Sequence, residues 1–347
     1  MNHGGNVWRS GPPGRWLDFS ANLRPGGPPE WVREALRVGL DAAAYYPDPG
    51  MRAAREALGR YLGVDSEWVL PTAGGISAID LAAGLPAPGM RTFSPCFGEY
   101  AQLAANRGRE VRTLPLLSGR TLRRPAEVLR DADCAVWLCN PLNPVGAAFP
   151  RTEIAALLGA VEAAGGWLVI DEAFIHCCPE HSSVGLLSAH PRLVILGSLT
   201  KSLGIPGVRA GYLCAHPDVL RMLAERQLTW ELSCFANSVI RELPKHAAQL
   251  RTESARNAAR REELRRGLKS LGAFVYPSAA NFLLADLGTD AAPVAEGLRE
   301  RGILVRECMD FQGIDDGRHL RLAVKDEAAN ARLIGELREV LRCAESR

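Results

Sequence analysis

The chain has 347 residues, which is enough for one large core and a second, smaller lobe. Its 41 lysines and arginines against 39 aspartates and glutamates leave a net charge of +2, and no apolar run approaches membrane-spanning length, so we expect neither a nucleic-acid nor a membrane partner. Nine cysteines without framework spacing, and an opening MNHGGNVWRSGPPGRW without an apolar signal region, indicate reduced thiols in a cytoplasmic protein.

Apolar runs and helical stretches alternate through the first two thirds of the chain. A glycine turn followed by a helix is predicted in TAGGISAIDLAAGL (72–85). Buried strands are predicted at 134–140, 166–173 and 192–199, and the apolar spacing of 151–166 indicates a crossover helix between the first two. This alternation predicts an α/β fold with a mainly parallel sheet covered on both faces.

The pattern of the chain changes near residue 240. A long charged helix at 243–272 precedes shorter strands at 281–287 and 303–308, which is typical of a smaller α+β lobe. The predicted division is an N-terminal arm that contributes to the small domain (1–40), a large domain (41–240) and a small C-terminal domain (241–347).

Three polar side chains follow three separate predicted strands. Asn143 in CNPLNPVG, Asp171 in VIDEAF and Lys201 after VILGSL stand at carboxyl ends, where the ligands of open parallel sheets bind. Each signal alone is weak, because Asn-Pro often only turns the chain and Asp often only caps a helix. A lysine beside a core strand loses its proton readily when it is buried, so Lys201 is a candidate nucleophile toward an aldehyde.

Together with Arg209, these groups are the set that pyridoxal phosphate requires. We expect Lys201 to form the covalent link, Asp171 to keep the ring nitrogen protonated and Asn143 to donate to the ring oxygen. For Phe97, stacking on the ring and plain core packing both stay open. The expected phosphate contacts are Arg209, Ser198, either Thr200 or Ser202, and the backbone N–H groups of Gly74, Gly75 and Ile76.

CNPLNPVG, DEAF after a buried strand, and SLTKS with IPGVRAGY resemble fold-type I pyridoxal-phosphate enzymes of the aminotransferase superfamily. The resemblance runs from HGGN (3–6) to the last helix. It implies a mostly parallel seven-stranded sheet in a large cofactor-binding domain, beside a smaller α+β domain. Two branches are similar: the histidinol-phosphate aminotransferases and the threonine-phosphate decarboxylases of cobalamin biosynthesis. HGGN, LDFSANLRP (17–25), the Phe of DEAF and SLTK with IPGVR favour the second branch.

The same resemblance implies further site residues. Tyr46 would reach the cofactor phosphate of a neighbouring subunit, so a homodimer with shared active sites is expected. Arg321 in HLRLAV resembles the arginine that binds the substrate carboxylate, and Arg306 is expected as a second anion contact. The N-terminal residues that would close over the substrate and its phosphate are His3, Ser20 and Asn22.

The sequence departs from the family pattern at four places, one of which is Ser233, where an asparagine is common in this branch. Phe174 stands where related aminotransferases commonly carry Tyr, as expected of the decarboxylase branch. Ile76 and Ser77 stand where the family tends to be polar or acidic. Arg24 stands where a neutral or acidic residue is usual, which leaves open an extra cation for the substrate phosphate or an exposed loop arginine.

The implied activity is decarboxylation of O-phospho-L-threonine to (R)-1-amino-2-propanol O-phosphate for the cobalamin side chain. Two alternatives stay open: transamination of histidinol phosphate, which uses the same cofactor residues, and decarboxylation of O-phospho-L-serine, which differs by one methyl group.

Other classes of protein fit less well. A P-loop around Lys201 fails because its two glycines would fall on Ile195 and Thr200. A regulator on the same fold would need a DNA-binding module, for which we find no helix-turn-helix pattern. HCCPEH (176–181) is similar to a metal site, but adjacent cysteines rarely converge on one ion, so no metal is expected.

Overall fold

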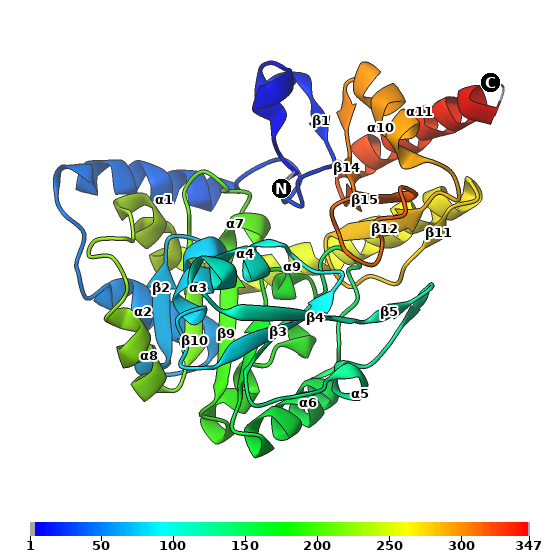
Figure 1. Cartoon of the computed structure of the whole chain (residues 1–347). Helices are drawn as coiled ribbons and strands as arrows, with labels where there is room; N and C mark the ends of the chain where they lie inside the picture. The colour runs from blue at the N-terminus through cyan, green and yellow to red at the C-terminus, as the bar shows by residue number, and fades with distance from the viewer. Residues whose placement is uncertain (1–3, 346–347) are drawn as a thin grey trace.

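The computed structural model describes residues 4–345, and its larger part is built on one seven-stranded sheet (Figure 1). The strands are β2 (Val69–Thr72), β3 (Gly89–Ser94), β4 (Glu110–Pro115), β7 (Ala135–Cys139), β8 (Trp167–Asp171), β9 (Leu193–Ser198) and β10 (Gly211–Ala215). Their order is β2-β10-β9-β8-β7-β3-β4, and β10 alone runs antiparallel to its neighbours. The predicted mostly parallel seven-stranded sheet is confirmed.

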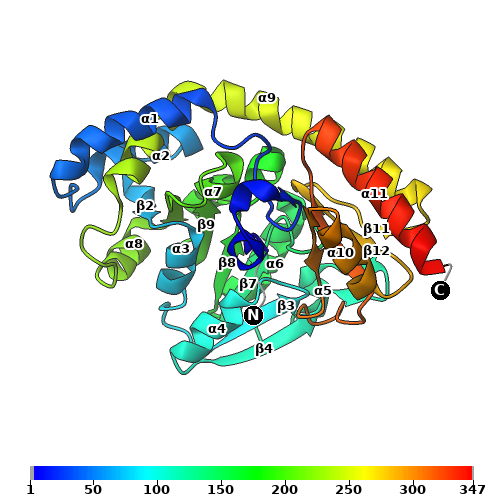
Figure 2. The same cartoon turned by 90° about the horizontal axis from the view of Figure 1, so that it is seen from above.

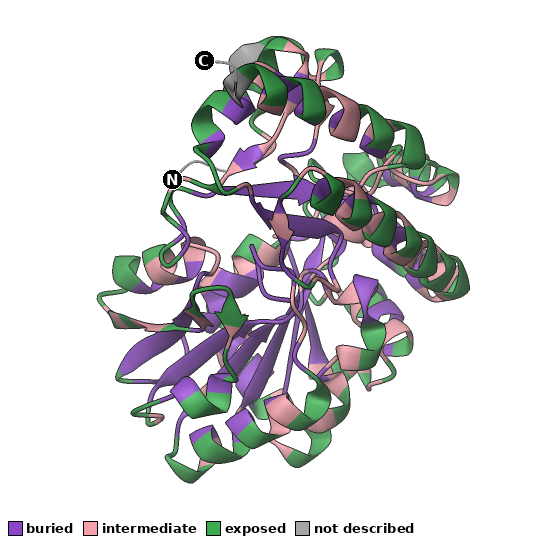
Figure 3. Ribbon diagram, turned by 90° about the vertical axis from the view of Figure 1, so that its right-hand side faces the viewer, coloured by how far each residue is buried: buried purple, intermediate pink, exposed green. Residues whose placement is uncertain are grey.

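The central strands are buried along nearly their whole length, as Figure 3 shows. They read AVWLC, WLVID and LVILGS, with no polar residue facing solvent at alternate positions. Such runs are typical of a parallel sheet covered by helices on both faces. The register pairs Asp171 with Cys139 on one side and with Leu196 on the other, so the carboxyl ends of β7, β8 and β9 lie at one edge.

Helices connect and cover the strands of this sheet. The predicted crossover helix 151–166 is observed as α6, three residues shorter at its end. The helix predicted after the glycine turn is α3. The bounds are α1 (Glu30–Asp41), α2 (Arg52–Leu62), α3 (Gly75–Ala82), α4 (Glu99–Asn106), α5 (Pro125–Val128), α6 (Arg151–Ala163), α7 (Leu199–Ser202) and α8 (Pro217–Ala224).

A four-stranded antiparallel sheet, in the order β11-β12-β15-β14, organises the C-terminal part. The predicted strand 303–308 is wrong in one respect, because the chain changes partner at Val305: Ile303–Leu304 pairs with the N-terminal β1, and Arg306–Glu307 pairs with β15. The strands outside the seven-stranded sheet, and two C-terminal helices, have these bounds: β1 (Leu17–Asp18), β5 (Leu117–Ser118), β6 (Thr121–Leu122), β11 (Phe274–Val275), β12 (Phe282–Asp286), β13 (Ile303–Leu304), β14 (Arg306–Glu307), β15 (His319–Ala323), α10 (Ala291–Glu300) and α11 (Glu327–Glu345).

One long helix, α9 (Cys234–Ser270), extends along both parts (Figure 2). It contacts α1 and α2 toward one end and α11 toward the other. Its predicted start at residue 243 is too late, because the helix begins where the Ser233 side chain accepts a hydrogen bond from the Ala236 N–H (3.1 Å).

Two separate hydrophobic cores lie on the two sides of the molecule. Val239 and Ile240 of α9 belong to the larger core, and Leu264 and Leu268 belong to the smaller one, which also includes Phe19 of the N-terminal arm. The domain limits after residues 40 and 240 stay a prediction. Within residues 4–345, every helix is too short or too polar to cross a membrane.

Candidate active site

A cavity of about 260 Å³ lies at the carboxyl ends of β7, β8 and β9. It brings together side chains that the sequence separates by as many as 301 positions, from Ser20 of the N-terminal arm to Arg321 of β15. The predicted residues that line it are Ser20, Asn22, Gly75, Ile76, Phe97, Asn143, Asp171, Ser198, Thr200, Lys201, Arg209, Arg306 and Arg321.

Lys201 lies in the single turn of α7, directly after the buried strand β9. Burial lowers the pKa of its amine most, and the nearby cations Arg321 and Arg209 add to this effect while Asp171 opposes it, so that the pKa is about 8. An amine with this pKa is partly neutral at physiological pH and can attack an aldehyde. The role of Lys201 in covalent attachment stays a prediction, with which this pKa is consistent.

The lowered pKa predicts how the reactivity of Lys201 depends on pH. The neutral amine dominates above a pKa of about 8, so the rate at which cofactor-free protein captures pyridoxal phosphate should rise about tenfold from about pH 7 to 9 and then level off. Borohydride trapping followed by peptide mapping at Lys201 measures this rate, with exposed Lys245 as the control. A rate that still climbs steeply above pH 9, as for a free lysine, would contradict the assignment.

Asp171 ends β8 and points its carboxylate into the cavity. One oxygen accepts from the Ala173 N–H (2.9 Å), and the other accepts from the Tyr100 hydroxyl. Burial raises the pKa of Asp171, while these two hydrogen bonds and the charge of Lys201 act in the opposite direction. A carboxylate held in this way has a fixed orientation and can face a protonated ring nitrogen.

Tyr100 is a residue that the sequence analysis missed. It lies one helical turn after Phe97 in FGEY, is almost fully buried and packs edge-on against Phe97 with ring centres 5.7 Å apart. A tyrosine at this spacing is a typical core residue, so only its contact with Asp171 marks it as part of the site.

Arg321 connects three parts of the cavity. Its guanidinium donates to Asn143 Oδ1 (2.7 Å) and to the carbonyl oxygen of Ser20 (2.8 Å). Its Nε is buried and has no hydrogen-bond partner among residues 4–345, and burial lowers the pKa of the group to about 10. A buried cation with an unused donor is suited to an anionic ligand. Because Oδ1 of Asn143 is taken, its amide N–H group is the one available to a ligand, as the predicted role requires.

Arg306 also lines the cavity, but its charge already has a partner. It donates to both carboxylate oxygens of Asp310 (2.6 and 2.8 Å), and its guanidinium lies 5.0 Å from the ring centre of Phe311. Asp310 and Phe311 were not singled out in the sequence. The pairing makes Arg306 a weaker anion contact than Arg321.

The start of α3 forms a small cradle with the end of β9. Gly74 was predicted to offer its N–H to the phosphate, but that N–H donates to the carbonyl oxygen of Thr72 (2.7 Å), which leaves the N–H groups of Gly75 and Ile76. A Cβ atom at Gly74 would lie 2.7 Å from the Arg209 guanidinium, so glycine allows that arginine to cover the turn. The Ser198 and Thr200 hydroxyls, 2.8 Å apart, complete the cradle. Such a helix start favours an anion.

Glu231 supports this cradle from a distant segment. Its carboxylate accepts hydrogen bonds from the Ala73 N–H (3.2 Å), the Gln227 side chain (2.6 Å) and the Ser77 hydroxyl. Ser77 stands where the family tends to be polar or acidic, and here it binds an acidic residue instead. No pattern in the sequence links Glu231 to the glycine turn.

The N-terminal segment covers one side of the cavity. The Ser20 hydroxyl donates to Asp18 (2.6 Å) and accepts from the Gly5 N–H (2.8 Å), and the Oδ1 atom of Asn22 is buried without a partner among residues 4–345. His3 lies outside the described residues. These contacts hold the segment against the cavity wall.

Two predicted side chains lie outside this cavity. Tyr46 is 80% exposed and stacks on Trp230, with ring centres 4.4 Å apart. Arg24 is not the exposed loop arginine of its second alternative: its side chain is 20% exposed, donates to the carbonyl oxygen of Gly27 (2.7 Å) and lies 3.8 Å from Glu253, while its role toward a substrate phosphate stays a prediction. Among residues 4–345, no cluster of three or more His, Cys, Asp or Glu side chains is arranged to hold a metal ion.

Comparisons with known proteins agree with this geometry. Residues 15–337 match the family model described as aminotransferase class I and II. The chain is 31% identical to the threonine-phosphate decarboxylase of Salmonella typhimurium, over 98% of this chain and 96% of that protein. It is 29% identical to a histidinol-phosphate aminotransferase of Geobacillus thermodenitrificans, over 94% and 90% of the two chains.

Solved structures show the same two kinds of neighbour. The L-threonine-O-3-phosphate decarboxylase of Porphyromonas gingivalis superposes with a TM-score of 0.84 and 25% identity, covering 93% of this chain and 99% of that one. The histidinol-phosphate aminotransferase of Clostridium acetobutylicum gives 0.85 and 25%, covering 93% and 98%. The backbone therefore does not separate the two activities.

Proposed function

This chain belongs to the aminotransferase class I and II family, and on that premise we propose that it is a pyridoxal-phosphate-dependent decarboxylase of O-phospho-L-threonine. The product is (R)-1-amino-2-propanol O-phosphate, which supplies the side chain of cobalamin. The observation that carries the proposal is the convergence of Lys201, Asp171 and Asn143 in one cavity, in a chain that matches a threonine-phosphate decarboxylase over nearly its whole length.

The residues of the cavity fit pyridoxal phosphate. The cradle at Gly75, Ile76, Ser198, Thr200 and Arg209 has the donors that a phosphate needs, and a Cβ atom at Gly74 would disturb it. Asp171 supplies a carboxylate for the ring nitrogen, and Phe97 supplies an apolar face. When bound, this cofactor withdraws electrons from the substrate carbon.

The side chains of the cavity bind the substrate and deliver the proton. Arg321, with its unused Nε, binds the substrate carboxylate, and the N-terminal segment with Ser20 and Asn22 binds the distal phosphate together with His3. Lys201 delivers a proton to the carbon that loses the carboxylate, which an amine with a pKa of about 8 does readily near neutral pH. Phe174, in the cavity wall, offers no hydroxyl to the ring oxygen.

The decisive experiment supplies purified protein with pyridoxal phosphate and O-phospho-L-threonine and measures carbon dioxide release. Amino transfer from histidinol phosphate to 2-oxoglutarate is measured in parallel, because that activity belongs to the other group of similar proteins. Release without transfer is the expected result. Transfer without release would instead place the protein among the aminotransferases.

The same assay defines the substrate. Threonine without its phosphate should be turned over far more slowly, and equal turnover would contradict the phosphate site. O-phospho-L-serine is the closer alternative, because one methyl group is worth only about 1–3 kcal/mol in a binding pocket.

The proposal includes a cytoplasmic homodimer in which Tyr46 reaches the neighbouring cofactor phosphate. A group of exposed apolar side chains around α1 and the segment after α8 supports such an interface: Val38, Leu40, Tyr45, Tyr46, Leu228 and Trp230. All nine cysteines are unpaired, which supports a reducing compartment. Sedimentation of the purified protein tests the dimer.

A further inference from the structure

We propose that Lys201 exchanges its proton with solvent through a second route behind the active site, and that His176 is the relay in this route. The inference rests on the proposed function. Decarboxylation breaks the bond between carbon and carboxylate and forms a carbon–hydrogen bond, so each turnover takes up one proton from solvent. Amino transfer only moves a proton from one atom to another. A decarboxylase therefore has to reload its proton donor from solvent once in each turnover, and a second route allows this while the substrate covers the front of the site.

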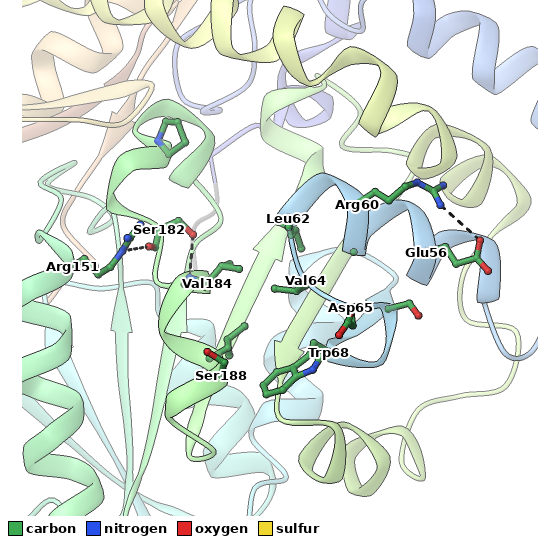
Figure 4. A pocket seen from close by; sticks show the side chains of 16 residues that line it. Glu56, Arg60, Leu62, Val64, Asp65, Trp68, Arg151, Ser182, Val184 and Ser188 are labelled. Atoms are coloured by element: carbon green, nitrogen blue, oxygen red, sulfur yellow. Dashed lines mark hydrogen bonds and ion pairs between the residues drawn. The ribbon is translucent and has the colours of Figure 1, made fainter.

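The outer end of this route is an open groove of about 1020 Å³ between the end of α2 and the segment 179–188 (Figure 4). Leu62 and Val64 line one side of it, and Ser182 and Val184 line the other. Arg151 lies at the rim, where its side chain donates to the carbonyl oxygen of Ser182 (2.9 Å). The residues that line the groove are all different from those that line the active-site cavity.

An inner cavity of about 220 Å³ adjoins this groove and is lined by both polar and apolar side chains. It shares Leu62, Pro179, Ser182 and Val184 with the groove. At its inner end it shares Ser198 with the active site. The titratable residues that line it are Tyr61, Glu172, His176, Tyr212 and Arg251.

A third cavity, of about 30 Å³, has lining residues in common with the inner cavity and is also lined by Lys201. His176 and Ser202 line both of these cavities, and Lys201 lines both the third cavity and the active site. Its volume suits one or two water molecules, for which about 10–15 Å³ each is enough. The other charged groups at this cavity, Arg24 and Glu253, lie 3.8 Å from each other.

The chemistry of His176 and Glu172 suits proton transfer along this path. His176 makes no hydrogen bond to the residues at 4–345, and burial together with the charge of Lys201 lowers the pKa of its imidazole to about 4. A neutral imidazole accepts a proton at one nitrogen and donates one from the other. Glu172 accepts from the Ser182 hydroxyl (2.8 Å) and the Ser183 N–H (2.5 Å), and burial raises its pKa to about 7, so it gains and loses a proton near neutral pH.

The test compares His176→Ala with His181→Ala, a histidine on the same segment that lines none of these three cavities. In a stopped-flow pH jump, the absorbance of the bound cofactor reports protonation at Lys201 without any substrate. We expect this relaxation to slow about 10²-fold in His176→Ala, at the lower end of the 10²–10⁴-fold range of positioned proton donors, and to stay unchanged in His181→Ala. Added imidazole should restore the rate in His176→Ala.

Two outcomes would overturn the inference. One is an unchanged pH-jump relaxation in His176→Ala with cofactor bound normally. The other is a slowed relaxation that imidazole does not restore although the melting temperature is unchanged, since this indicates a structural role. With substrate, the relay predicts a lower kcat at constant KM and a larger solvent deuterium effect in His176→Ala. Because the pH jump uses no substrate, it is independent of the carbon dioxide assay, and failure of one is distinguishable from failure of the other.

Discussion

Replacing Lys201 by alanine should lower the decarboxylation rate by more than about 10⁴-fold, because the substitution removes both the covalent attachment and the proton donor. The cavity itself should persist, since the Lys201 side chain makes no hydrogen bond within residues 4–345, and its backbone carbonyl, which the substitution keeps, accepts from the Arg24 N–H (3.1 Å). The measurements are carbon dioxide release and the absorbance that reports covalent attachment, before and after borohydride treatment.

Lys245→Ala is the matched control for this change. Lys245 lies on the exposed side of α9, paired with Glu242 at 2.9 Å, and its loss should leave both measurements unchanged. Full activity in Lys201→Ala, or cofactor trapped at another lysine, would refute the whole assignment of the site.

The second large effect is expected at Arg321. Truncating a buried, hydrogen-bonded cation that binds an anion costs about 2–5 kcal/mol, so kcat/KM of Arg321→Ala should fall by roughly 30- to several thousand-fold. Arg321→Lys should recover only part of this loss, because an ammonium group lacks the fork that reaches both Asn143 and Ser20. Cofactor absorbance and melting temperature show whether each variant keeps its fold.

Arg306→Ala provides the comparison within the same cavity. Its guanidinium is already bound to both oxygens of Asp310, so the change should lower kcat/KM less than about tenfold. A larger loss at Arg306 than at Arg321 would reverse the two roles and would move the carboxylate site toward β14.

Much of the site was predictable from the sequence, for a physical reason. Parallel strands that are buried on both faces have continuous apolar sequences, and their carboxyl ends lie at one edge of the sheet. Polar residues directly after such runs therefore meet in space, which located Asn143, Asp171 and Lys201. The glycine turn before α3 could also be predicted from residue type, because only a small residue there allows the Arg209 side chain to lie close to the turn.

Contacts between segments that are far apart in the chain could not be predicted from the sequence. Tyr100 on Asp171, Glu231 on Ser77 and Asp310 on Arg306 depend on how helices and loops pack, and each of these side chains has an ordinary environment in its own stretch of chain. The strand 303–308 was misjudged for the same reason, since its two halves pair with different sheets.

Local patterns thus determined three neighbouring strands of the sheet, the edge at which ligands bind and the chemistry of the residues there, because these follow from periodicity and residue type along a short segment. The tertiary structure decided which charges are neutralised, which donors stay unused and which cavities meet at Lys201. Those properties depend on burial and on partners more than a hundred residues away, so Arg321 and Arg306, alike in sequence as arginines in strands, differ in what they offer a ligand.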